Sequence, residues 1–201
     1  VKLRITAKAK NGVEAKNIIK PVKEKLKKEF SKFIFGEDND TLPSVLIKEL
    51  TKRNQTIVFA ESCTGGLLSS SITSISGSSQ VFKGSIVSYS NELKNSLLNI
   101  SEDKLNKYGA VSEEVCEAMA INVKNRLSAD WAIAISGIAG PSGGTKEKPV
   151  GLVYISISGP DNHITNIKKI YNSTRNRIEI QTLSVNVCLN SLRLILLSNS
   201  K

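Results

Sequence analysis

Apolar residues recur along the chain with two alternating spacings, and this alternation predicts an α/β protein. Short apolar runs at 56–60, 84–89 and 131–135 are typical of strands, and two more strands are predicted at 150–158 and 164–171. Helical spacing predicts helices at 43–53, 65–76, 91–98, a short segment after Ser101, 112–127 and the C-terminal segment. Alternating units predict a three-layer α/β/α sandwich, and the final pair of strands makes its sheet mixed.

The beginning of the chain predicts a small unit of its own. Residues 1–9 alternate apolar and polar positions, as a strand with one buried face does, and helical spacing follows Asn11-Gly12. Phe33-Ile34-Phe35 has the pattern of a short closing strand. We therefore expect a basic β-α-β unit over residues 1–36, followed by a linker and a main domain over residues 41–201.

The net charge of +10 is concentrated in this first unit. Residues 1–36 carry eleven Lys and Arg residues against three Glu residues, a net charge of +8. Such a unit could contact nucleic acid or another polyanion. It lacks a Gly-X-X-Gly loop or an exposed aromatic pair, and lysines on the outer face of a helix are usually only solvated. Nucleic-acid binding through residues 1–36 is therefore the lesser alternative.

Composition narrows the class of protein. A hydrophobic content of 40% and a charged content of 23% are typical of a soluble globular protein. The longest apolar run is far short of a membrane span, and no leader pattern opens the chain. The three cysteines are scattered without metal-ligand spacing, so we expect a reducing cytoplasm and neither zinc nor a disulfide framework. Because the chain begins without Met, we interpret it as a piece of a longer polypeptide.

The segment Glu61-Ser62-Cys63-Thr64-Gly65-Gly66 joins an apolar strand to an apolar-periodic helix. Such a junction places a hydroxyl beside unpaired backbone N–H groups. These donors and the helix dipole favour negative charge, such as a phosphate or the oxyanion of an attacked carbonyl. The alternative is that Ser62 or Thr64 only caps the helix and the glycines form a tight turn.

Further candidate residues follow the other predicted strands. They are Tyr89-Ser90-Asn91 with Lys94 after the second strand, Gly137 to Gly144 after the third, and Arg175 after the last. In an open α/β sheet, ligands bind beyond the carboxyl ends of the strands, so we expect these groups to share one edge. The glycine-rich loop lets backbone approach a ligand closely, but it lacks the Gly-Lys-Ser/Thr ending of a Walker loop.

A nucleophilic Ser62 would need a base. The single histidine, His163, falls in a predicted hairpin turn, which argues against a Ser-His-Asp triad. Lys94 could act as the base if burial leaves its amine neutral; the alternative is a solvated lysine. Cys63 is a rival nucleophile, but adjacent residues at such a turn usually point apart.

Several of these motifs together resemble a known family. They are Ala60-Glu61-Ser62-Cys63-Thr64-Gly65-Gly66, Tyr89-Ser90-Asn91-Glu92 with Lys94, Gly109-Ala110-Val111-Ser112, Ser136-Gly137-Ile138-Ala139-Gly140-Pro141 and Lys148-Pro149-Val150-Gly151. In this order they are similar to the C-terminal domain of the CinA family of competence/damage-inducible proteins, which includes nicotinamide-mononucleotide amidohydrolase. Residues 1–36 resemble the small KH-like linker domain that precedes it in longer members.

The resemblance implies hydrolysis of the carboxamide of nicotinamide mononucleotide to nicotinate mononucleotide and ammonia. It implies a pyridine nucleotide as the small-molecule partner and a homodimer; we expect no cofactor, no metal and no membrane. Ser62 would be the nucleophile and Lys94 its general base, while Tyr89 would orient that pair or shuttle its proton. The alternative is a non-catalytic nucleotide- or nucleic-acid-binding module of a larger protein, including a pocket that has lost turnover.

The resemblance also implies residues that hold the substrate. Backbone N–H groups near Thr64, Gly65 and Gly66 would bind the oxyanion. The loop formed by Gly137, Ile138, Ala139 and Gly140 would form one wall of the substrate pocket. Arg175 would bind the nucleotide phosphate. Ser173-Thr174 stand where relatives have Gly-Asp, which affects the turn before Arg175.

Overall fold

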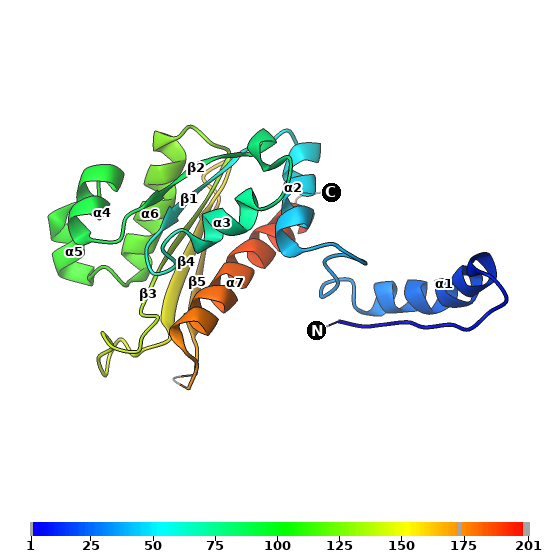
Figure 1. Cartoon of the computed structure of the whole chain (residues 1–201). Helices are drawn as coiled ribbons and strands as arrows, with labels where there is room; N and C mark the ends of the chain where they lie inside the picture. The colour runs from blue at the N-terminus through cyan, green and yellow to red at the C-terminus, as the bar shows by residue number, and fades with distance from the viewer. Residues whose placement is uncertain (1, 173, 199–201) are drawn as a thin grey trace. The chain divides into compact units, whose positions relative to one another are not determined.

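The structure is a computed structural model that describes residues 2–172 and 174–198 (Figure 1). Its internal contacts divide the chain into two compact units, Val1–Thr41 and Leu42–Lys201. Each unit is described by itself.

The first unit contains one helix, α1 (Gly12–Glu29), whose first turn is capped by the side chain of Asn11. The predicted β-α-β arrangement is wrong: residues 2–41 contain no strand, and a KH-like unit is not evident. The alternating segment 2–9 has no neighbouring segment in this unit that accepts its backbone hydrogen bonds, and an unpaired strand is not stable. At the other end, the Ile34 N–H bonds to the Phe30 carbonyl in a turn that ends the helix.

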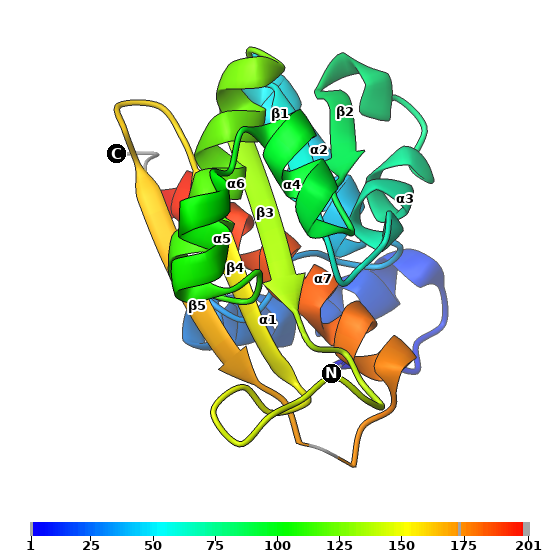
Figure 2. The same ribbon diagram turned by 90° about the vertical axis from the view of Figure 1, so that its left-hand side faces the viewer.

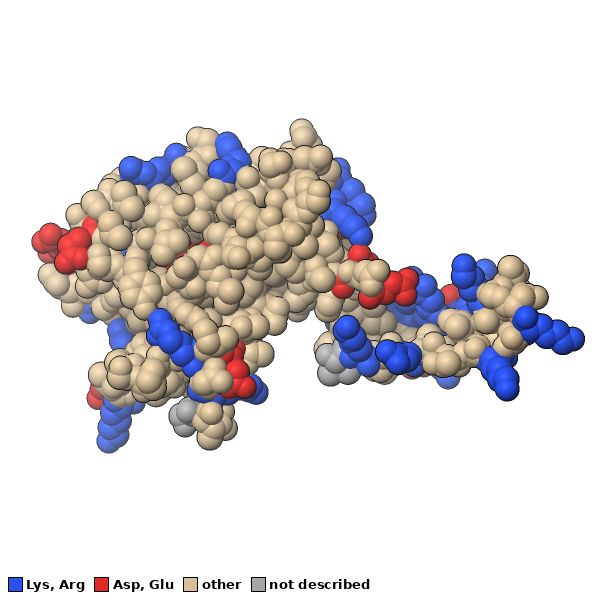
Figure 3. Space-filling view, viewed as in Figure 1, with Lys and Arg blue, Asp and Glu red and all other residues tan. Residues whose placement is uncertain are grey.

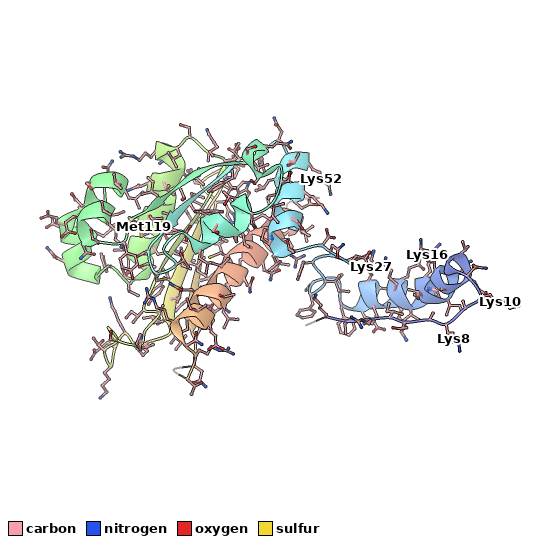
Figure 4. The ribbon with its side chains drawn as sticks, in the orientation of Figure 1. Lys8, Lys10, Lys16, Lys27, Lys52 and Met119 are labelled. Atoms are coloured by element: carbon pink, nitrogen blue, oxygen red, sulfur yellow. The ribbon has the colours of Figure 1, made fainter. Side chains whose placement is uncertain are left out.

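The surface of the first unit is basic and the unit has no core. No residue of α1 is buried. Several Lys and Arg side chains project from the surface of the unit in Figure 3, and Lys8, Lys10, Lys16 and Lys27, labelled in Figure 4, are all exposed. The concentration of charge expected from the sequence is therefore presented to solvent.

The second unit contains the elements that the apolar spacing predicts. The helices are α2 (Leu42–Lys52), α3 (Leu67–Thr73), α4 (Asn91–Leu98), α5 (Glu102–Tyr108), α6 (Glu113–Arg126) and α7 (Arg177–Ser198), with the short 3-10 helix η1 (Ser78–Gln80). The strands are β1 (Ile57–Glu61), β2 (Phe82–Val87), β3 (Trp131–Gly137), β4 (Leu152–Ser158) and β5 (Ile164–Ile170). The helix α3 begins later than predicted because Gly65 and Gly66 adopt positive φ angles.

The five strands form one sheet in the order β2-β1-β3-β4-β5, and the sheet is mixed, as predicted. β1 is parallel to both β2 and β3, whereas β4 is antiparallel to β3 and β5. The strands β1, β2, β3 and β5 therefore run in one direction, and the segments that follow them start from the same edge of the sheet.

Helices cover both faces of this sheet (Figures 1 and 2). Alternate residues of the central strands enter two separate cores, as strand geometry requires. Phe59 and Ile133 pack in the core under α2, α3 and α7. Val58 and Ala132 pack in the core under α6, which includes Met119, labelled in Figure 4. The result is the predicted three-layer arrangement.

The last helix, α7, belongs to the first of these cores. By length and composition alone it could cross a membrane, but Ile180, Leu189 and Leu196 are buried within the folded unit. A core helix commonly passes the same test. Its first two turns lie at the edge of the sheet where the candidate residues gather.

Candidate active site

Ser62 lies in a β-turn between β1 and α3. Its N–H donates to the Ile135 carbonyl at 3.0 Å, and its own carbonyl accepts from the Gly65 N–H at 3.1 Å. The first bond holds the turn against β3, and the second closes the turn over residues 62–65. The side chain of Ser62 is nearly buried, since the residue is 8% exposed.

The carboxylate of Glu61 accepts hydrogen bonds from this turn and from the first residues of α3. It is fully buried and accepts five hydrogen bonds, from the hydroxyls of Thr64 and Ser69 and from the N–H groups of Gly66, Leu68 and Ser69. An anion at the N-terminus of α3 satisfies N–H groups that have no partner inside the helix. Glu61 belongs to the sequence motif, but this role was not predicted, although an acid that ends a buried strand is itself a signal.

These bonds change which N–H groups are available to an oxyanion. The sequence predicted donors near Thr64, Gly65 and Gly66, but the Gly65 and Gly66 N–H groups bond to Ser62 and Glu61. Within residues 2–172 and 174–198, the N–H groups of Cys63 and Thr64 have no acceptor. The turn therefore presents two adjacent donors beside Ser62.

Lys94 extends from α4 to Ser62. The helix begins after Ser90, whose hydroxyl accepts from the Leu93 N–H at 3.2 Å. The amine nitrogen of Lys94 lies 3.0 Å from the Ser62 hydroxyl oxygen, 2.7 Å from the Ser88 carbonyl and 3.5 Å from the Tyr89 carbonyl. The residue is 1% exposed, so the alternative of a solvated lysine is wrong.

The surroundings of Lys94 favour its neutral form. Burial lowers the pKa of its ammonium group below the ordinary value, although the nearby Cys63 and Cys116 thiols act in the opposite direction. No carboxylate lies within ion-pair distance of Lys94 in the described part of the chain. When the two carbonyls accept the N–H groups of a neutral amine, its lone pair faces Ser62. The pair can then transfer a proton from the alcohol to the amine.

Cys63 makes no hydrogen bond to Lys94 in the described residues; the Lys94 amine contacts Ser62, Ser88 and Tyr89 instead. Its side chain packs in the core beneath α7, and burial raises the pKa of its thiol to about 12. A thiol reacts as its thiolate, so this environment makes Cys63 a poor nucleophile. Of the two adjacent residues, Ser62 is the one whose side chain contacts Lys94.

Tyr89 contributes its carbonyl rather than its hydroxyl to the Ser62–Lys94 pair. Its hydroxyl accepts a hydrogen bond from Arg177 at 2.8 Å, and Arg177 also donates to the Gly140 carbonyl at 2.9 Å. Arg177 was not predicted from the sequence. It connects the start of α7 to the segment after β2 and to the loop after β3, both of which were predicted to belong to the site. Four positions further along α7, Gln181 donates to the Cys63 carbonyl at 2.7 Å.

Arg175 precedes α7 at the same edge of the sheet. It is exposed, and its guanidinium has no hydrogen-bond or ion-pair partner in the described residues. It therefore remains available to bind an anion. Ser173, part of the predicted departure from the family pattern, lies outside the described residues.

The loop after β3 needs its small residues for packing. A Cβ on Gly137 would lie 2.7 Å from a methyl group of Val153, and one on Gly140 would lie 2.6 Å from a methyl group of Val150. Ala139 is buried, whereas Ile138 is half-buried. The bond from Arg177 to the Gly140 carbonyl joins this loop to the start of α7, so the predicted substrate wall lies at the same edge as Ser62.

His163 lies at the opposite edge of the sheet. It is in the turn between β4 and β5, and its ring stacks edge-on against Trp131, the first residue of β3, at 5.8 Å. A Ser-His pair is therefore excluded by geometry.

Two surface hollows of the structure lie away from Ser62 and Lys94. Their volumes are about 240 and 380 Å³, and both adjoin Asn99 and Asn122 between α4 and α6. Neither is lined by Ser62, Lys94 or the start of α7. Within the described residues, no group of three or more His, Cys, Asp or Glu residues could hold a metal ion.

Comparison with known proteins identifies the second unit. The family model described as the CinA C-terminal domain matches residues 39–196. A CinA-like protein of Prochlorococcus marinus is 90% identical over 201 residues, which cover 100% of this chain and 47% of that protein. A CinA-like protein of Nostoc punctiforme is 44% identical over 198 residues, which cover 98% of this chain and 48% of that protein. The chain thus spans about half the length of these relatives.

Solved structures share the fold of the second unit. The competence/damage inducible protein CihA of Agrobacterium tumefaciens superposes with a TM-score of 0.74 at 35% identity, over 79% of this chain and 96% of that one. A competence-damaged protein (CinA) superfamily member of Klebsiella pneumoniae superposes with a TM-score of 0.74 at 27% identity, over 78% of this chain and 96% of that one. Both comparisons agree with the family match.

Proposed function

The chain belongs to the CinA C-terminal domain family, and from this premise we propose that it hydrolyses the carboxamide of nicotinamide mononucleotide to nicotinate mononucleotide and ammonia. The observation that carries the proposal is the 3.0 Å contact between the Lys94 amine and the Ser62 hydroxyl, made by a lysine that is buried without an acid. An alcohol paired with a neutral amine is the machinery that acyl transfer requires.

In the first half of the reaction, the Ser62 oxygen attacks the carboxamide carbon while the Lys94 amine takes the hydroxyl proton. The carbonyl oxygen becomes an oxyanion, which the N–H groups of Cys63 and Thr64 stabilise. The Lys94 ammonium then gives its proton to the amide nitrogen. The C–N bond breaks, ammonia leaves, and an ester links Ser62 to the pyridine carbonyl.

In the second half, water attacks this ester and Lys94 takes a proton from the water. The same N–H groups stabilise the second oxyanion, and Lys94 returns the proton to the Ser62 oxygen as the ester bond breaks. The carboxylic acid product is released and loses its proton, which the ammonia takes up in solution, and the amine is neutral again. One water is consumed and one ammonia is formed.

The substrate class rests on the family resemblance and on the unpaired cation beside the site. Arg175 is exposed at the edge of the sheet that carries Ser62, so it can bind a phosphate without losing an internal partner. A mononucleotide amide has a phosphate and a carboxamide at opposite ends. Arg175 would bind the first while Ser62 attacks the second.

The proposal is tested by measuring ammonia release from nicotinamide mononucleotide, nicotinamide riboside and nicotinamide. We expect the mononucleotide to be the preferred substrate, and Ser62→Ala to abolish turnover while leaving the thermal unfolding curve unchanged within a few degrees. Equal turnover by Ser62→Ala and wild type would refute the serine mechanism. Binding of the mononucleotide in calorimetry without ammonia release would favour a pocket without catalysis.

The charge of the first unit favours a second candidate function, the binding of nucleic acid. Residues 1–36 carry a net charge of +8, and the labelled lysines of α1 are exposed (Figure 4). Binding of this kind weakens steeply with salt. A gel shift at low salt that is lost when residues 1–36 are removed would support it, and no shift at low salt would refute it.

A further inference from the structure

We infer that Gln181 is a positioning residue that fixes the oxyanion-binding N–H of Thr64. The inference rests on the proposed amide hydrolysis and names a role in that reaction for a residue of α7. The side-chain amide of Gln181 donates to the Cys63 carbonyl at 2.7 Å, across 118 positions of sequence. This carbonyl belongs to the peptide group that carries the Thr64 N–H.

The geometry of the β-turn makes this peptide group the adjustable part of the site. The turn is closed by the bond from the Gly65 N–H to the Ser62 carbonyl, so Cys63 and Thr64 are its two central residues. Type I and type II turns keep that closing bond and differ mainly by a flip of the central peptide group. A flip would reverse the Cys63 carbonyl and the Thr64 N–H together.

The bond from Gln181 selects one of these two orientations. The peptide group between Cys63 and Thr64 is trans, so its C=O and N–H point in opposite directions. With the carbonyl held toward α7, the Thr64 N–H is held away from α7. Thr64 does not adopt the positive φ of a type II turn, which agrees with this orientation. Gln181 therefore holds the donor in place before the oxyanion forms.

Neighbouring contacts make Gln181 the side chain suited to this role. The Ser62 N–H bonds to the Ile135 carbonyl and the Thr64 hydroxyl bonds to Glu61, so both flanks of the central peptide group are fixed. Arg177, one helical turn earlier on the same face of α7, anchors Gly140 and Tyr89 instead. The start of α7 thus braces three separate segments of the site, and Gln181 braces the one that carries Ser62.

Three variants separate a catalytic effect from a structural one. Gln181→Met keeps the length of the side chain but removes the donor. Gln181→His keeps an N–H at nearly the same reach. Asn186→Met is the matched control, because Asn186 is an exposed amide on the same helix.

Steady-state ammonia release and thermal unfolding are measured for all three variants and the wild type. We expect Gln181→Met to lower kcat about tenfold, the weight of one hydrogen bond, while KM for nicotinamide mononucleotide stays within about twofold. We expect Gln181→His to recover most of this loss and Asn186→Met to match the wild type.

A second readout does not depend on turnover. The 3-formylpyridine analogue of the mononucleotide adds the Ser62 hydroxyl to its aldehyde carbon, and the carbonyl oxygen becomes the hydroxyl of a tetrahedral adduct. We expect Gln181→Met to weaken its binding by the same factor as kcat, and to leave binding of nicotinate mononucleotide unchanged.

Other outcomes overturn the inference in distinguishable ways. Wild-type kcat in Gln181→Met, or equal losses in the Met and His variants, would overturn the role of Gln181 and leave the proposed function standing. An equal loss of affinity for the adduct-forming analogue and the product would do the same. A wild-type chain that releases no ammonia from these amides would overturn the proposed function and this inference with it.

Discussion

Replacing Lys94 by methionine or by arginine tests whether Lys94 acts as a base or only as a positive charge beside Ser62. Methionine matches the length of lysine but has no nitrogen. Arginine keeps a cation and hydrogen-bond donors but stays protonated in proteins. If Lys94 acts only by placing positive charge beside Ser62, the arginine variant should retain activity. If it acts by accepting the Ser62 proton, both variants should fail.

The expected loss of kcat is large because neither Glu61 nor His163 can replace Lys94 as the base. A positioned general base contributes about 10²- to 10⁴-fold to rate, or about 3 to 5 kcal/mol of activation free energy. The Glu61 carboxylate is committed to five hydrogen bonds, and His163 lies at the other edge of the sheet. We therefore expect both Lys94 variants to lose about 10⁴-fold in kcat, the upper end of this range.

The assay is initial-rate ammonia release from nicotinamide mononucleotide at saturating substrate. Circular dichroism and thermal unfolding establish that each variant is folded. Product binding measured by calorimetry shows whether the pocket is intact. Activity of Lys94→Arg within about tenfold of wild type would refute the role of Lys94 as a base, because no neutral nitrogen would then be required.

Three further substitutions test the roles of other residues. Glu61→Gln should lower the free energy of unfolding in denaturant by about 3 kcal/mol, because an amide cannot replace the charged acceptor; a loss below about 1 kcal/mol would contradict its bracing role. Cys63→Ala should keep kcat within about threefold, since burial raises the pKa of the thiol to about 12, and inactivation would restore Cys63 as the nucleophile. Tyr89→Phe should leave kcat within about threefold, because the carbonyl that contacts Lys94 remains; a loss of 100-fold or more would assign a proton transfer to the hydroxyl.

The sequence predicts the second unit well because each of its elements is locally specified. Apolar runs mark the buried strands, and Ser90, Ser101 and Ser112 each cap the helix that follows. Parallel strands place their carboxyl ends at one edge, so the meeting of Ser62 and Lys94 could be expected from their positions alone.

The sequence does not predict contacts that depend on long-range placement. Gln181 and Arg177 reach residues 118 and 88 positions away, and only their spacing on one face of an apolar helix hints at a shared role. The alternation in residues 2–9 indicates a strand, but a strand also needs a partner, which the pattern of one segment cannot supply. Local pattern therefore predicted the helix α1 correctly, whereas the strands that it predicted on either side of α1 are not found in the described residues.

The most direct test of the account is the titration of the Lys94 amine itself, followed by nitrogen NMR in protein labelled at its lysine side chains and assigned with Lys94→Met. We expect the pKa of Lys94 to lie below that of the exposed lysines, because burial disfavours the ammonium form, and kcat/KM to rise with pH along the same curve. A Lys94 that titrates together with the exposed lysines, or a rate that does not change across its titration, would contradict the claim that a neutral amine activates Ser62.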